Sequence, residues 1–261
     1  MQTINVNSWE EFEGQLKLHT STGAKFLFRG QGNSSWLLET TLERCGQEQR
    51  QMLFKDYYRL ISAAVRPQIE ASTAIRWDDV PSYPDVEKKA MEYLAFLHEP
   101  IPAYSYMAYL RHHGFPSPLL DWTRTPHVAA YFAFREPANE RVAIYVYSER
   151  PETKSGSNTE AAIRVLGQYV STHRRNFLQQ SEYTVCLSHK IGHGWSFAPH
   201  EGVFTLDDPN QDLLWKFTLP STERLKVLKR LDAYNLNAYS LFESEESLME
   251  TIALREIDFK R

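Results

Sequence analysis

Residues 111 to 135 constrain the fold of this chain more than any other part of the sequence. They form a turn rich in proline, then an apolar step that carries Asp121, and then an apolar segment. Thr125 can act as N-cap by accepting a hydrogen bond from a free backbone N–H, and Pro126 suits the first helical position. Residues 127–134 are apolar nearly all round, which predicts a helix buried inside the domain.

Asp121 lies between a leucine and a tryptophan, just before this predicted helix. A carboxylate in such surroundings costs free energy unless it is paired or hydrogen-bonded. Arg29, at the end of an apolar segment at residues 25–31, is a suitable partner. An Arg29–Asp121 pair can be purely structural or can belong to a ligand site, and the sequence leaves both interpretations open.

The chain has 261 residues, no internal repeat and no low-complexity linker, so we expect one domain over residues 1–261. Its net charge of −4 means that the chain as a whole lacks the positive charge typical of nucleic-acid-binding proteins. Cys45 and Cys186 have neither metal-binding nor redox spacing, which favours a reducing compartment. No apolar run approaches membrane-spanning length, and the first residues are unlike a signal peptide. We therefore expect a cytoplasmic protein that is not associated with membranes.

Hydrophobic periodicity predicts a mixed order of strands and helices. Residues 160–180 are compatible with either. Strands are expected at residues 3–6, 25–31, 141–148, 182–188 and 212–219. Helices are expected after a Ser8–Glu11 capping box, at 52–64, 85–98, 104–113 and 125–134, and again at 220–231 and 244–255, with a short apolar segment at 236–242. The fold class is α+β, with small antiparallel or mixed sheets and a helical insert at about residues 45–113.

Two motifs together resemble the FRG domain family, which takes its name from a Phe-Arg-Gly motif. The first is FLFRGQ at residues 26–31, followed by Trp36, and the second is HHGFPSPLLDWTRTPHVAAYFAF at residues 112–134. His112 stands where the family usually has Gln, and Ser117-Pro118 stands where it usually has Thr-Arg. The resemblance runs from about Lys25 to the last helix, but it does not by itself define an activity.

The order of three segments is also similar to ADP-ribosyltransferases of the Arg-Ser-Glu type. Arg29 follows a strand, Asp121-Trp122-Thr123 precedes the helix segment AAYFA, and Gln180-Ser181-Glu182 opens a later strand. FRG proteins usually have an apolar residue at the place of Glu182. This resemblance implies sheets of the ADP-ribosyltransferase type and NAD as substrate.

The chemistry of NAD cleavage explains the residue types that this resemblance assigns. Breaking the nicotinamide–ribose bond passes through an oxocarbenium-like cation, which a carboxylate stabilises. Glu182 is therefore the expected catalytic residue, and Gln180, two residues earlier, is expected on the same strand face to orient the acceptor. The residues expected to hold NAD are Arg29, Gly30, Gln31, Asp121, Trp122, Thr123 and Tyr131.

Each of these residues also has a plain structural interpretation. Trp122 and Tyr131 can belong to the core instead of stacking on nicotinamide. Thr123 can cap the following helix, and Glu182 can be a solvated acid at a strand end. Only the order of the three segments favours the enzyme.

The basic run His173-Arg174-Arg175 can receive the phosphate backbone of a nucleic acid or can be a solvated face.

We expect an ADP-ribosyltransferase toxin that modifies a macromolecule, with RNA favoured over DNA and protein. By resemblance it would belong to a bacterial toxin–antitoxin or phage-defence system and be held inactive by an antitoxin protein. The alternatives are a non-catalytic FRG module that binds a nucleotide or partner, and an NAD glycohydrolase. His189, His193 and His200 lack the spacing of a metal site, and no metal is expected.

Overall fold

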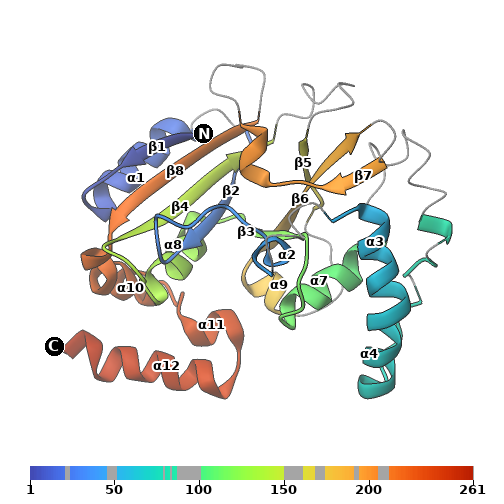
Figure 1. Cartoon of the computed structure of the whole chain (residues 1–261). Coiled ribbons are helices and arrows are strands. Elements are labelled where there is room, and N and C mark those ends of the chain that lie inside the picture. The colour runs from blue at the N-terminus through green and yellow to red at the C-terminus, as the bar shows by residue number, and fades with distance from the viewer. Residues whose placement is uncertain are drawn as a thin grey trace.

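A single mixed sheet is the frame of the molecule in the computed structural model (Figure 1). The structure describes residues 1–20, 24–45, 52–78, 80–82, 84–86, 101–149, 161–167, 174–190, 194–204 and 212–260. The strand order is β1-β8-β4-β2-β3-β6-β5, and β7 pairs with β6. The strands are β1 (Gln2–Asn5), β2 (Leu27–Gln31), β3 (Leu120–Thr123), β4 (Arg141–Ser148), β5 (Ala162–Val165), β6 (Ser181–Lys190), β7 (Gly194–Phe197) and β8 (Leu213–Pro220).

Of the paired strands, β1 and β8 run parallel and the others antiparallel. The predicted combination of helices with a mixed, mostly antiparallel strand arrangement is confirmed. The strands form one eight-stranded sheet, however, where small sheets were predicted. The reason is that β4 pairs along its length with both β2 and β8, which joins strands from distant parts of the chain.

The helices cover this sheet and include a helical group inside residues 45–113. They are α1 (Trp9–His19), α2 (Thr41–Arg44), α3 (Phe54–Arg59), a π-helix (Leu60–Val65), α4 (Arg66–Thr73), α7 (Tyr104–His112), α8 (Pro126–Arg135), α9 (Arg174–Leu178), α10 (Arg224–Ala233), α11 (Ala238–Phe242) and α12 (Glu245–Glu256). None of the helices in the described parts of the chain has both the length and the apolar character to cross a membrane.

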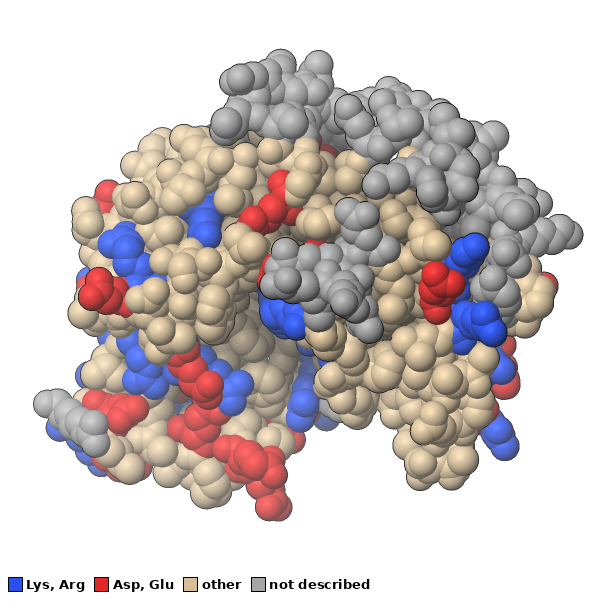
Figure 2. Space-filling view, in the orientation of Figure 1, with Lys and Arg blue, Asp and Glu red and all other residues tan. Residues whose placement is uncertain are grey.

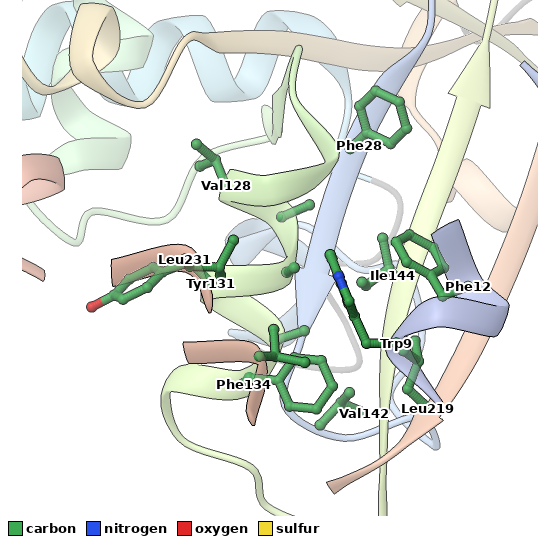
Figure 3. Packing of buried hydrophobic residues seen from close by; sticks show 14 of the residues in the cluster. Trp9, Phe12, Phe28, Val128, Tyr131, Phe134, Val142, Ile144, Leu219 and Leu231 are labelled. Carbon is green, nitrogen blue, oxygen red and sulfur yellow. The ribbon is translucent and has the colours of Figure 1, made fainter. Parts of the chain in front are cut away.

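The apolar helix predicted after Asp121 is α8, and it lies at the centre of the main core. The Thr125 hydroxyl accepts a hydrogen bond from the N–H of His127, and Pro126 occupies the first turn, as the sequence predicts. Six residues of α8 are buried, and they pack with α1, α10 and the inner faces of β2, β4 and β8. Figure 3 shows this contact, with Phe134 of α8 on the side of Trp9 of α1, while Tyr131 points away from α1 on the other side of α8.

A second core forms where α3 and α7 pack on β6, and it is separate from the core around α8. Tyr183, Val185 and Leu187 point from β6 toward these helices. Figure 1 shows α7 and α8 on the same side of the sheet. The sheet between them is weakly joined, since β2 and β3 share the single residue pair Phe28–Thr123, whereas β3 and β6 share four pairs.

Most predicted elements lie close to their predicted positions, with instructive exceptions. Ser8 caps α1 as predicted, but the Glu11 carboxylate accepts from the N–H of Asn7, so the predicted reciprocal box is shifted by one residue. Residues 160–180 contain both a strand, β5, and a helix, α9. The helix predicted at 85–98 lies mostly outside the described residues.

Gly30 allows α8 to pack directly on β2. A Cβ atom at Gly30 would lie 1.8 Å from the carbonyl oxygen of Ala129 and 2.6 Å from the backbone nitrogen of Ala133. Because these are backbone atoms of a buried helix, they cannot move aside as a flexible side chain would. The glycine of the Phe-Arg-Gly motif therefore has a packing role, whatever else the motif does.

Substituting Gly30→Ala should lower the free energy of unfolding by about 3 kcal/mol, because it overpacks the α8–β2 contact. Gly14→Ala is the matched control, since Gly14 lies in α1 with nothing within 4 Å of an added Cβ. The control should stabilise the chain by about 0.5–1 kcal/mol, because alanine favours helix. Urea denaturation measures both. Equal effects of the two substitutions would contradict the packing role.

Candidate functional site

A cavity of ≈ 790 Å³ opens where β2 and β3 part. Its floor comes from β2, β3 and β6, and its sides come from the last turn of α7 and from one face of α8. Residues of α9 and α11 form another part of the cavity wall. Figure 2 shows a hollow near the centre of this face with Lys and Arg side chains beside it. The volume is in the range of sites that hold a small organic ligand.

An ion network of three residues spans the gap between the strands. Arg29 Nη1 donates to Asp121 Oδ1 at 2.7 Å and to the Asp121 carbonyl oxygen at 2.8 Å. Arg111 Nη2 donates to the same Oδ1 at 2.8 Å. The side chains of Arg29 and Arg111 are 10% and 21% exposed, while that of Asp121 is 43% exposed. One carboxylate thus fixes two largely buried guanidinium groups at the cavity.

The charges in this network stabilise one another. Burial would raise the pKa of Asp121, but the guanidinium groups of Arg111 and Arg29 outweigh burial and hold that pKa well below its usual range. The Asp121 carboxylate in turn raises the pKa of Arg111. The Asp121 carboxylate is therefore ionised at neutral pH, and two guanidinium groups beside one carboxylate leave the network with a net positive charge. Asp121 is too weak a base to accept a proton there.

The two arginines keep donors that no other described residue uses. The Nε atoms of Arg29 and Arg111 are buried and have no hydrogen-bond partner among the residues that the structure describes. Within the same residues, Nη2 of Arg29 and Nη1 of Arg111 also make no hydrogen bond. Buried donors without partners are rare in folded proteins. Both side chains line the cavity, so a bound anion can satisfy them.

Other charged residues make the cavity cationic, although the whole chain carries −4. Five arginines and three acids line it. The arginines are Arg29, Arg44, Arg111, Arg135 and Arg175, and the acids are Glu39, Asp121 and Glu136. Burial and the charges of Arg29 and Arg111 lower the pKa of Arg44, which shows that these three cations repel one another. An anionic ligand would relieve that repulsion.

Six of the residues predicted to hold NAD line this cavity: Arg29, Gly30, Gln31, Asp121, Trp122 and Thr123. Gln31 donates through Nε2 to the carbonyl oxygen of Leu37 and keeps a buried Oε1 without a partner among the described residues. Trp122 is buried, its indole packs on Tyr147, and its Nε1 donates to Thr184 at 2.8 Å. The structural interpretation of Trp122 is the one that this packing fits.

Tyr131 does not line the cavity and is buried in α8, where its hydroxyl donates to Glu250 at 3.1 Å. The face of α8 that lines the cavity carries Ala129, Phe132 and Arg135 instead. Tyr131 therefore does not reach a ligand bound there.

Glu182 lies away from the cavity. It pairs with Trp122 in the β3–β6 register and does not line the cavity, whereas Trp122 and the flanking Ser181 and Tyr183 do. The Glu182 carboxylate is fully buried, and its Oε1 accepts from Lys25 Nζ at 2.5 Å. Its Oε2 has no partner among the described residues. The structure therefore does not bring Arg29 and Glu182 to one cavity.

Gln180 also lies outside the cavity lining. The residue is exposed, with a left-handed backbone (φ 47°), in the turn that precedes β6. The expected alternation of Gln180 and Glu182 along one strand face fails because the strand starts only at Ser181.

The predicted basic run is divided by α9. Arg174 is 74% exposed and pairs with Glu243 at 3.1 Å, whereas Arg175 lines the cavity. His173 lies outside the described residues. The run therefore does not act as one surface patch in the described part of the chain, and Arg175 belongs with the cavity.

The structure describes His189 and His200 among the three histidines considered for a metal. Burial, with a smaller contribution from Arg29, lowers the pKa of His200 to about 3, and its Nε2 contacts the Thr184 hydroxyl at 2.9 Å. His193 is outside the described residues. No group of three or more His, Cys, Asp or Glu side chains among the described residues is placed to hold a metal ion.

Sequence reasoning missed several residues of the cavity, above all Arg111, Arg44 and Phe242. The sequence places Arg111 in the last turn of the helix predicted at 104–113, where a cation suits the helix dipole. Its position ten residues before Asp121 is the one sequence signal that suggests a second partner for this acid. Arg44 and Phe242 lie far from both motifs and carry no such signal.

Comparison with protein-family models matches residues 24–141 to the FRG domain. The match supports the FRG domain family, and it contains Arg29, Arg44, Arg111, Asp121 and all of α8. No curated protein and no solved structure matches this chain. The cavity residues of β6, α9 and α11 follow the matched segment, so the site extends beyond it.

Asp121→Asn should lower the free energy of unfolding at pH 6, because two buried guanidinium groups lose their anion. The folded pKa of Asp121 is lowered, so its stabilisation is present above the unfolded pKa of about 3.9 and is lost as pH falls below that value. The difference between wild type and Asp121→Asn should therefore be smaller at pH 3 than at pH 6. Urea denaturation at both pH values measures it, and a difference that widens at pH 3 would contradict the ion network.

Proposed function

We propose that the cavity binds a phosphorylated ligand of nucleotide size, with its phosphate at Arg29 and Arg111. The observation that carries this proposal is the pair of guanidinium groups that are fixed by Asp121 yet keep unused donors at the cavity. Phosphate presents several acceptor oxygens, which match the planar donor fork of arginine. Arg44 adds a third cation beside them.

The sequence predicts NAD as the nucleotide, and the cavity has room for a ligand of that class. Gln31 supports a sugar-bearing ligand, since its buried Oε1 can accept a hydrogen bond from a hydroxyl group. Asp121 also supports a sugar-bearing ligand, because its carboxylate is 43% exposed. The hydrogen bonds that the described residues make to Asp121 reach its Oδ1 or its backbone carbonyl oxygen.

ADP-ribosyl transfer is the second candidate function. Its support is that the Arg29, Asp121-Trp122-Thr123 and Glu182 segments lie on the consecutive strands β2, β3 and β6. The burial of Glu182 with Lys25 outside the cavity lining speaks against it, because the ribose cation would lack that carboxylate. We therefore place ligand binding first and keep the toxin activity, the RNA acceptor and the antitoxin as predictions.

Arg29→Lys should weaken the binding of ADP at least about tenfold, because lysine keeps the charge but loses the fork that reaches Asp121 and phosphate together. Arg44→Ala should weaken it by a smaller factor without touching the ion network. Isothermal titration calorimetry at low salt measures both affinities. Thermal unfolding of each variant shows whether it is folded.

Glu182→Gln is the matched control and should leave ADP affinity within about twofold of wild type, since Glu182 does not line the cavity. A loss of binding in Glu182→Gln as large as in Arg29→Lys would contradict the assignment of the site. Nicotinamide release from NAD, followed by chromatography, tests transfer or hydrolysis separately. Binding of NAD without nicotinamide release would contradict both ADP-ribosyl transfer and NAD hydrolysis, and it would support ligand binding alone.

A further inference from the structure

One part of the cavity wall is aromatic and lies on residues that the phosphate site does not use. Phe132 of α8 and Phe242 of α11 contact each other edge to face, with ring centroids 6.0 Å apart and an angle of 87°. The guanidinium carbons of Arg135 and Arg175 lie 4.9 Å and 5.6 Å from the centroid of Phe242. All four side chains line the cavity and are half-buried. We call these four residues the aromatic wall.

The aromatic wall is held in place from three directions. Arg135 donates to both carboxylate oxygens of Glu250, at 2.9 Å and 2.7 Å. Gln179 of the α9 segment donates through Nε2 to the carbonyl oxygen of Leu241 at 3.1 Å, just before Phe242. Glu243, directly after Phe242, has a left-handed backbone (φ 49°) and ends α11 there. Left-handed residues other than glycine cost energy and persist where the surroundings fix them.

The charges of the aromatic wall make it a poor second phosphate site. Glu250 already neutralises Arg135 through two hydrogen bonds. What the wall offers instead at the cavity is two phenyl rings and two guanidinium planes, with both guanidinium groups over the ring of Phe242. Planar heteroaromatic rings stack on such surfaces, both on phenyl rings and on arginine.

We infer that the aromatic wall is a subsite for a planar heteroaromatic ring, a nucleobase or a nicotinamide, of the same ligand whose phosphate lies at Arg29 and Arg111. This inference rests on the proposed function and deepens it, because it makes the ligand a nucleotide and not merely a phosphorylated compound. It also gives Arg175 a role in binding the ligand, while its neighbour Arg174 lies outside.

The test compares two probes, ADP and pyrophosphate, which share the phosphate groups but differ in base and sugar. Calorimetry would measure both affinities for wild type, Phe242→Leu, Arg175→Gln and Arg174→Gln. Leucine at position 242 keeps an apolar side chain but removes the ring, and it removes no charge. Arg174→Gln removes a neighbouring charge that pairs with Glu243 outside the cavity.

Wild type should bind ADP at least about tenfold more tightly than pyrophosphate. Phe242→Leu and Arg175→Gln should each lose most of this preference for ADP over pyrophosphate. The affinity of Phe242→Leu for pyrophosphate should stay within about twofold of wild type. Arg174→Gln should bind both probes like wild type.

Equal affinity of wild type for the two probes would overturn the ring subsite while leaving the phosphate site intact. Weakening of both probes by the same factor in Phe242→Leu would overturn it as well, because the wall would then be only structural. Binding of neither probe to wild type would overturn the proposed function and the subsite together. Thermal unfolding of Phe242→Leu separates a loss of fold from a loss of ligand contacts.

Discussion

The ion pairs that Asp121 makes with Arg29 and Arg111 are the interaction on which the candidate site depends. They join β2, β3 and the last turn of α7 across a gap where the sheet is held by one residue pair. Without the carboxylate, two guanidinium groups would face each other at a partly buried position. With it, they are fixed in place while their remaining donors stay available to the cavity. The same three residues thus account for local stability and for the choice of an anion as ligand.

The gap itself follows from how the two sides of the sheet are packed. On one side, Gly30 brings α8 so close to β2 that a Cβ atom at this position would overlap the α8 backbone. On the other side, β3 pairs with β6, which packs on α7 and α3 in a separate core. These two cores therefore meet at the gap, while Leu27 of β2 and Leu120 and Trp122 of β3 share a third core. A cavity between two cores gains side chains from both, which explains why α7 and α8 each supply an arginine to one site.

The sequence predicted the parts of the site that local rules control. Thr125 and Pro126 define the start of α8, and the acid before it does pair with Arg29. Two other features depend on long-range structure. The strand face of Glu182 is set by the β3–β6 register, and a shift of one residue reverses every side chain. Phe242 reaches the cavity only because α11 folds back onto α9, which no local pattern indicates.

The central claim is that Arg29 and Arg111 hold an anion through donors that the folded chain leaves unused. Nitrogen-15 NMR of the arginine Nε–H groups, recorded while pyrophosphate is added, tests this most directly. The account predicts that the resonances of Arg29 and Arg111 shift together and saturate at one ligand per chain, while that of Arg174 does not move. Unchanged resonances of Arg29 and Arg111 at concentrations where pyrophosphate binds elsewhere on the protein would contradict it.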